Sequence, residues 1–319
     1  MNKMKWLIRR ELWEHKGMLV WAPAVVAALI AAMASLALFM GRNISFNHDG
    51  DASQLGQVAI EGHMRDKIVD GMAQTYMAAA LPLYLMLGFL VFFYCLGALH
   101  DERRDRSLLF WKSLPVSDRM TVLSKAVLAL VVAPLITTAI AMVLSLFVVL
   151  CACAVLLMHG TNLFGGLLAT PEFYLTPLRV LGLLPVYLLW ALPTVGWLLL
   201  VSSMARSKVF LWAVGTPVVA SLLLLWAERS LNLAVNANWF IEKIVDRILL
   251  GVVPGSWFLF EMHSEGVTSL ADHQQLFQPN TLLAVSWNTL GSASAWLGVA
   301  AGVAMLAGAA WMRRRREEG

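Results

Sequence analysis

Charged residues are scarce in this chain. Only 14% of its 319 residues are Asp, Glu, Lys or Arg, whereas soluble globular chains carry about 25%. Hydrophobic residues make up 59% of the chain, and its mean hydropathy is +0.70. Such a chain cannot cover a water-facing surface, which excludes an ordinary soluble protein. The net charge of +4 is spread over short segments between apolar stretches, so we do not expect nucleic acid as a partner.

Several kinds of reactive site are also missing from the sequence. The three cysteines, Cys95, Cys151 and Cys153, lie in apolar stretches and cannot be read as a disulfide framework. No group of His and Cys has zinc spacing, so no metal site is expected. The phosphate-binding pattern Gly-x-x-x-x-Gly-Lys-Ser/Thr is absent, because Lys112-Ser113 follows Trp111. We therefore expect no ATP or cofactor on this chain and no enzymatic activity of its own.

The sequence contains six long apolar stretches. They contain no Asp, Glu, Lys or Arg and run over Met18–Met40, Tyr76–Leu99, Ala126–Met158, Val180–Met204, Val209–Ala227 and Leu290–Trp311. Each is long enough to cross a hydrocarbon core of about 30 Å as a helix. Pro134 favours a kink in the third stretch. The sequence predicts an all-α membrane protein with six transmembrane helices in one domain, residues 1–319.

The distribution of basic residues predicts the orientation. If residues 1–17, 100–125, 206–208 and the C-terminal tail share one side, that side holds 17 of the 24 lysines and arginines. Loops with a basic excess remain in the cytoplasm. Both termini are therefore expected in the cytoplasm, with the protein in the bacterial inner membrane as a multi-pass chain.

Residues 1–17 mix basic residues with Trp6 and Trp13 at helical spacing. This pattern is typical of an amphipathic helix at the membrane surface, in contact with lipid. The alternative is a basic flank that only fixes the topology.

Two outer loops are expected, at residues 41–75 and 228–289. Within the second, Trp239–Leu250 has helical periodicity. Trp239, Phe240, Ile244 and Ile248 are expected to face lipid or protein, and Glu242, Asp246 and Arg247 to face water. This helix either dips into the outer leaflet or lies on it with no role in a pathway.

No ionisable side chain is predicted at membrane depth, where proton-coupled transporters and voltage sensors carry them. If the protein does work, its energy has to arrive through a cytoplasmic surface. The segment His100–Lys125 is the candidate, because it places charges around four bulky apolar residues, Leu108 to Trp111.

This segment resembles the cytoplasmic loop between the second and third spans of ABC-2 type permeases, the membrane subunits of one class of ABC exporters. Members typically read as charged residues, Gly-Thr-Leu-Glu, an apolar run and Pro-Val-Ser. The charged part here is Glu102-Arg103-Arg104-Asp105, Ser107-Leu108 stands for Thr-Leu, and Pro115-Val116-Ser117 is intact. Lys125 opens the third span, as a family Lys often does. Arg106 replaces the usual Gly and Leu109 the usual Glu.

The resemblance implies a short coupling helix that docks on a separate ATPase subunit, which binds ATP and Mg²⁺. The expected docking residues are Glu102, Arg103, Asp105, Arg106, Leu108, Leu109, Phe110, Trp111 and Leu114. Ser107 suits an N-cap, Pro115 ends the helix, and Phe110 and Trp111 are anchors of the kind enriched at interfaces. The alternative is that both aromatics lie in the headgroup layer.

By the same resemblance, the chain is expected to form a permease dimer and to export an amphipathic or hydrophobic substrate. Candidate pathway residues are Phe89, Phe92, Phe93, Trp212 and Thr216. Three rival functions remain: ATP-driven mechanical work on a partner, an intramembrane enzyme, and a membrane anchor or sensor. Aromatic residues in spans also serve simple packing.

Overall fold

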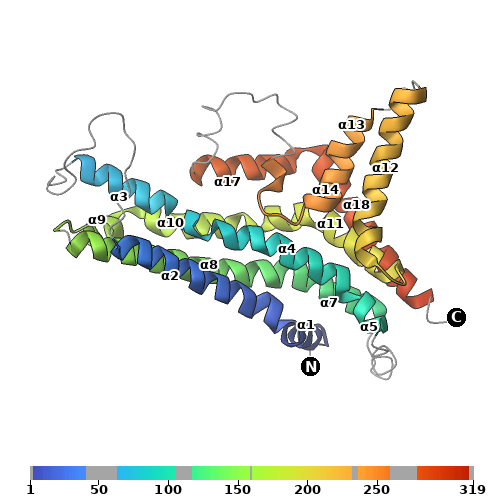
Figure 1. Ribbon diagram of the computed structural model, residues 1–319, viewed down its shortest axis with the longest axis horizontal. Helices are drawn as coiled ribbons and strands as arrows, with labels where there is room; N and C mark the ends of the chain where they lie inside the picture. Colours follow the sequence, from blue (N-terminus) through green and yellow to red (C-terminus); the bar gives the residue numbers. More distant parts are fainter. Residues whose placement is uncertain are drawn as a thin grey trace.

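The computed structural model describes residues 3–40, 63–104, 117–158, 160–231, 236–258 and 279–315. Within these ranges the chain is almost entirely helical and contains no strand (Figure 1). The expectation of an all-α fold is confirmed for this part of the chain.

Among the described residues, six helical runs are long and apolar enough to cross a membrane, as predicted. They are Gly17–Phe39, Arg65–Arg104, Asp118–Met158, Pro171–Met204, Val209–Leu231 and Ala293–Arg315. The chain is therefore a multi-pass membrane protein. The third run has 41 residues, about 60 Å of helix, which is twice the thickness of the hydrocarbon core. The long runs thus continue beyond the membrane.

The first three runs are built from consecutive helical pieces. Helix α1 (Lys3–Glu14) precedes the first run, which contains the π-helical turn η1 (Gly17–Trp21) and α2 (Ala22–Phe39). The second contains α3 (His63–Thr75), the 3₁₀ turn η2 (Tyr76–Ala80), α4 (Leu81–Ala98) and α5 (His100–Arg104). The third contains α7 (Asp118–Val127), the π turn η3 (Leu128–Val132) and α8 (Ala133–Met158).

The remaining described elements are also helical. They are α9 (Phe164–Ala169), α10 (Pro171–Gly182), α11 (Leu184–Met204), α12 (Val209–Leu231), α13 (Ala237–Phe240), the π turn η4 (Ile241–Val245), α14 (Asp246–Leu250), α17 (Pro279–Asn288), η5 (Thr289–Gly291) and α18 (Ala293–Arg315).

Pro134 coincides with a helix irregularity in the third run, where a kink is expected. Its ring has no N–H and collides with the carbonyl four residues earlier, that of Leu130. Leu130 lies in η3, so the wider π turn falls where the α-helical hydrogen bond is lost.

The core of the bundle surrounds α11, the most thoroughly buried of the six spans. Its main neighbour is α18, which crosses it at a pair of glycines (Figure 1). A Cβ added to Gly196 would lie 2.6 Å from the Gly302 carbonyl oxygen, and one added to Gly302 would lie 2.9 Å from the Leu192 backbone. Small residues of this kind let the backbones of membrane helices approach closely.

A second, smaller core lies at the other end of the long helices, around α3, α9 and α10 (Figure 1). Val69 and Ala73 of α3 pack with Val149 and Cys153 of α8 and with Leu167 of α9. Within the expected outer loop 41–75, residues 63–75 form helix α3. Val69 and Ala73 are four residues apart and present one apolar face, and this face is covered by neighbours far along the chain.

The helix expected at Trp239–Leu250 is present as α13, η4 and α14, but Arg247 does not face water. It is only 7% exposed and donates hydrogen bonds to the carbonyl oxygens of Ser294 and Ala295. Its guanidinium lies 4.3 Å from the centre of the Trp190 ring. The absence of a side chain at Gly298 makes room for the guanidinium, since a Cβ there would lie 2.2 Å from Arg247 Cζ. Burial lowers the pKa of Arg247 to about 10, which keeps the side chain charged at neutral pH.

Candidate functional site

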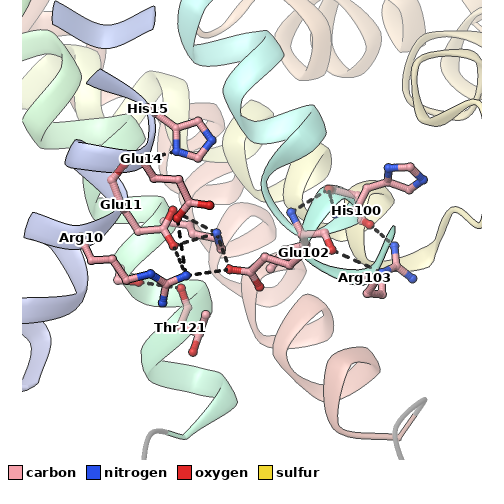
Figure 2. Close-up of polar contacts among 12 residues, drawn as sticks. Arg10, Glu11, Glu14, His15, His100, Glu102, Arg103 and Thr121 are labelled. Atoms are coloured by element: carbon pink, nitrogen blue, oxygen red, sulfur yellow. Dashed lines mark hydrogen bonds and ion pairs between the residues drawn. The ribbon is translucent and has the colours of Figure 1, made fainter. Parts of the chain in front are cut away.

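A buried lysine lies at the end of the bundle where α1, α5 and α7 meet. Its two carboxylate partners, Glu11 and Glu102, are labelled in Figure 2. Lys125, in the last turn of α7, is 1% exposed. Its Nζ lies 3.0 Å from both carboxylate oxygens of Glu11 on α1 and 2.9 Å from Oε1 of Glu102 on α5. A charged side chain is found at such depth only when its charge is compensated, and two carboxylates do so here.

Glu102 extends the cluster to the C-terminal helix. Its Oε2 accepts a hydrogen bond from Arg313 of α18 at 2.9 Å, and Arg10 of α1 lies 3.9 Å from Oε1. Arg313 Nε in turn donates to Asp118, in the first turn of α7, at 3.1 Å. We call these six residues, Arg10, Glu11, Glu102, Asp118, Lys125 and Arg313, the ion-pair cluster. They connect four helices, and both terminal segments of the chain take part.

Local sequence positions Glu11 for this role. Leu7 and Glu11 are one helical turn apart and form the buried face of α1. The Tyr94 hydroxyl of α4 donates to Glu11 Oε2 at 3.3 Å, and the His15 ring meets the Tyr94 ring edge-on with 5.0 Å between centroids. A carboxylate on a buried helix face is therefore held from two sides, by Lys125 and by Tyr94.

The described residues on either side of the segment 105–116 are also held in place by hydrogen bonds. Ser117 caps α7 by accepting a hydrogen bond from the Met120 amide, as Ser commonly does at this position. Before the loop, the Leu99 and His100 amides donate to Ser202 Oγ of α11 at 3.1 and 3.0 Å. Arg103 donates to the carbonyl oxygens of Ser202 and Ala205 at the C-terminal end of α11. Both ends of the loop are thus attached to the helical bundle.

The cluster is balanced, with three cationic and three anionic side chains. Burying an ion pair contributes little net stability, but removing one partner leaves an uncompensated buried charge that costs about 3–5 kcal/mol. The cluster therefore fixes the positions of α1, α5, α7 and α18 relative to one another. Among the residues that the structure describes, no group of three or more His, Cys, Asp or Glu is placed to hold a metal ion.

Two of the expected docking residues belong to these internal contacts. Glu102 is 8% exposed and its carboxylate is turned toward Lys125 and Arg313. Arg103 is half-buried against the end of α11. Their charged groups attach α5 to the bundle, and their docking role stays a prediction. Asp105, Arg106, Leu108, Leu109, Phe110, Trp111 and Leu114 lie outside the described residues, and their docking role stays a prediction.

The expected pathway residues lie mostly on the outside of the bundle. Phe89 is 65% exposed, and Phe93, Trp212 and Thr216 are also exposed. Phe92 is half-buried and packs against Phe93 and against Phe210 of α12. A pathway lined by the exposed four would need a second bundle opposite them, as the resemblance to a dimeric permease implies.

Five of the six members of the cluster were missed as site residues by sequence reasoning: Arg10, Glu11, Asp118, Lys125 and Arg313. A signal was available for three of them, since Lys125 and Arg313 are charges beside an apolar run and Glu11 interrupts the face that starts with Leu7. Their pairing spans 114 and 211 residues of chain, and no local periodicity encodes contacts at that separation.

Comparisons with known proteins identify no relative. No family model, no curated protein and no solved structure matches the chain.

Proposed function

We propose that this chain is the membrane-spanning permease subunit of an ATP-driven exporter of the ABC-2 type. The observation that carries the proposal is the attachment of both flanks of the loop 105–116 to the bundle. Glu102 before the loop and Lys125 after it share one buried ion pair at 2.9 Å. The segment that resembles a coupling loop is therefore attached at both of its ends to the bundle. A displacement of this segment would be transmitted to several helices.

The contacts define how a displacement of the loop would spread. Movement of α5 acts on α11 through Arg103 and Ser202, and on α18 through Glu102 and Arg313. Movement of α7 acts on α1 through Lys125 and Glu11. Because Lys125, Glu11 and Glu102 are buried, separating the lysine from the two carboxylates would leave buried charges without a partner. The ends of α1, α5 and α7 therefore favour moving together. Such a connected, packed element can adopt two discrete positions and so carry coupling.

The energy source in this proposal is a separate ATPase subunit that binds ATP and Mg²⁺. The sequence has no phosphate-binding loop of its own. The apolar stretches also carry no ionisable residue that would serve a proton or ion gradient. ATP binding and hydrolysis on the partner would then move the loop between two positions.

The uncharged spans favour an amphipathic or hydrophobic substrate, moved out of the cytoplasm across a bacterial inner membrane. The exposed aromatic residues Phe89, Phe93 and Trp212 are available to a second permease chain or to lipid. A dimer with the pathway between two bundles accounts for their position outside the core of a single chain.

A second function in the same class is mechanical work on a partner protein. It is favoured by the core of α3, α9 and α10, which extends the long helices beyond the thickness of a membrane. An extension of this kind offers a folded surface away from the bilayer. Export of substrate into membrane vesicles on addition of ATP separates transport from mechanical work, in which a partner protein is captured instead.

Purification from the native membrane tests the proposal. The tagged chain should retain an ATPase subunit after mild detergent extraction, and the complex should hydrolyse ATP. Replacing the phosphate-binding lysine of that subunit should abolish hydrolysis without dissociating it. A chain that is folded and abundant but retains no ATPase subunit would contradict the proposal.

A further inference from the structure

The outer face of α1 carries positive charge and tryptophan together. Lys5, Trp6, Arg9 and Trp13 occupy positions i, i+1, i+4 and i+8, which fall within an arc of about 100° on a helix. All four side chains are exposed, with Trp13 at 61%. Lys16, just beyond α1, is also exposed, and its Nζ lies 5.4 Å from the centre of the Trp13 ring. We call these five residues the basic face of α1.

The acidic residues of α1 are turned away from this face. Glu11 is buried and bound to Lys125 on the opposite side, beside the buried Leu7. Glu14 lies 3.5 Å from Arg10, which compensates its charge. The helix therefore divides its charges: Glu11 is engaged inside the protein, Glu14 is exposed but paired with Arg10, and the cations of the basic face are directed outward.

The position of α1 places this face at a membrane boundary. The first span begins at Gly17, directly after α1, and Trp21 in its first turns is exposed. In Figure 1, α1 is seen nearly end-on while α2 lies along the plane of the view, so α1 runs across the direction of the span. A helix that turns aside where its span leaves the hydrocarbon lies among lipid headgroups.

The C-terminal helix adds basic residues at the same end of the bundle. Arg313 joins the ion-pair cluster, and the next two residues, Arg314 and Arg315, are exposed. Arg315 lies 4.0 Å from the centre of the Trp311 ring, which repeats the pairing of a cation with an indole.

From this arrangement we infer that the basic face of α1 binds the headgroups of anionic lipids. Indole rings prefer the headgroup layer, and lysine and arginine near the surface are attracted to negatively charged lipid. Zwitterionic headgroups satisfy the tryptophans but carry no net negative charge to pair with the cations of the basic face. The face thus has the charge and the aromatic content that select an acidic headgroup, and this inference holds whether or not the chain is a permease.

The headgroup-binding face and Glu11 are opposite sides of one helix. Lipid bound to α1 therefore stabilises the position from which Glu11 reaches Lys125.

Native mass spectrometry of the full-length chain tests this inference. The purified, delipidated protein is titrated with dioleoyl phosphatidylglycerol or with dioleoyl phosphatidylcholine, and bound lipids are counted. The wild-type chain should prefer phosphatidylglycerol, and raised salt should weaken the preference. A Lys5→Gln, Arg9→Gln variant should bind phosphatidylglycerol at least tenfold more weakly, since each basic residue near a lipid surface contributes about fivefold.

The matched control is Lys67→Gln with Arg229→Gln, which removes two exposed charges from α3 and α12. It should retain the preference for phosphatidylglycerol. Equal affinity of the wild-type chain for both lipids overturns the inference, and this comparison needs no variant. An undiminished preference in the Lys5, Arg9 variant also overturns it. So does loss of a co-purifying ATPase subunit with lipid binding unchanged, because the face would then dock a protein.

Discussion

Lys125 Nζ lies 3.0 Å from each carboxylate oxygen of Glu11, a residue 114 positions earlier in the chain. This contact fixes the N-terminal helix to the start of the third span. Because Lys125 also meets Glu102, the same ammonium group holds together the two sides of the loop that is proposed to receive an ATPase.

Loss of Lys125 should destabilise the protein strongly. Lys125→Met leaves the Glu11 and Glu102 carboxylates buried with one fewer cation, which costs about 3–5 kcal/mol. The control is Arg119→Met, an exposed residue of the same helix, where a change within about 0.5 kcal/mol is expected. Adding Glu11→Gln to Lys125→Met should recover part of the loss. Thermal unfolding in detergent measures all three, and equal unfolding temperatures for Lys125→Met and Arg119→Met would refute the assignment.

The glycine crossing between α11 and α18 gives a second prediction. Gly196→Ala puts a methyl group 2.6 Å from the Gly302 carbonyl oxygen, so the helices must separate, at a cost of about 1–3 kcal/mol. Gly215→Ala in α12 is the control, because its added Cβ meets nothing within 4 Å. That substitution should leave stability unchanged or raise it by up to about 1 kcal/mol. Destabilisation of the same size in both variants would argue against the crossing.

The helical runs were predictable from the sequence because a long apolar stretch that crosses the hydrocarbon core must satisfy its own backbone hydrogen bonds, which a helix does. The charged contacts were not, because pairing between Glu11 and Lys125 depends on how helices far apart in the chain are packed. Arg247 shows the limit of periodicity. Its position on the polar side of an amphipathic helix predicts exposure, and only the ring of Trp190 and the gap at Gly298 reveal a buried site.

Burial of Arg247 is testable by cysteine labelling. A cysteine at Glu242, which is exposed, should react quickly with a membrane-impermeant maleimide. A cysteine at Arg247 should react at least tenfold more slowly, because the site is enclosed by α11 and α18. Labelling of both positions after unfolding in detergent controls for reactivity. Equal rates in the folded protein would contradict the observed packing.

The placement of both termini can be examined with reporter fusions. Arg313 reaches Glu102 and Glu11 reaches Lys125, so the two terminal segments lie at one end of the bundle. The basic excess predicts that this end lies in the cytoplasm. A fusion after Gly319 should report cytoplasm, and one within Asp49–Gln54 should report the outside. The reverse pattern, or the same side for both, would overturn the six-span orientation.

The central claim is that the loop between α5 and α7 docks an ATPase through Phe110 and Trp111. The most direct measurement compares retention of the ATPase subunit, and its ATP hydrolysis, in wild type, Phe110→Ala with Trp111→Ala, and Lys112→Ala, at matched membrane levels. Truncating aromatic anchors commonly costs 2 kcal/mol or more of binding, so the double variant should bind at least about thirtyfold more weakly. Lys112→Ala should change little, because an exposed charge pair contributes about 0–1 kcal/mol. Undiminished retention and hydrolysis in the double variant would mean that these aromatics do not dock an ATPase.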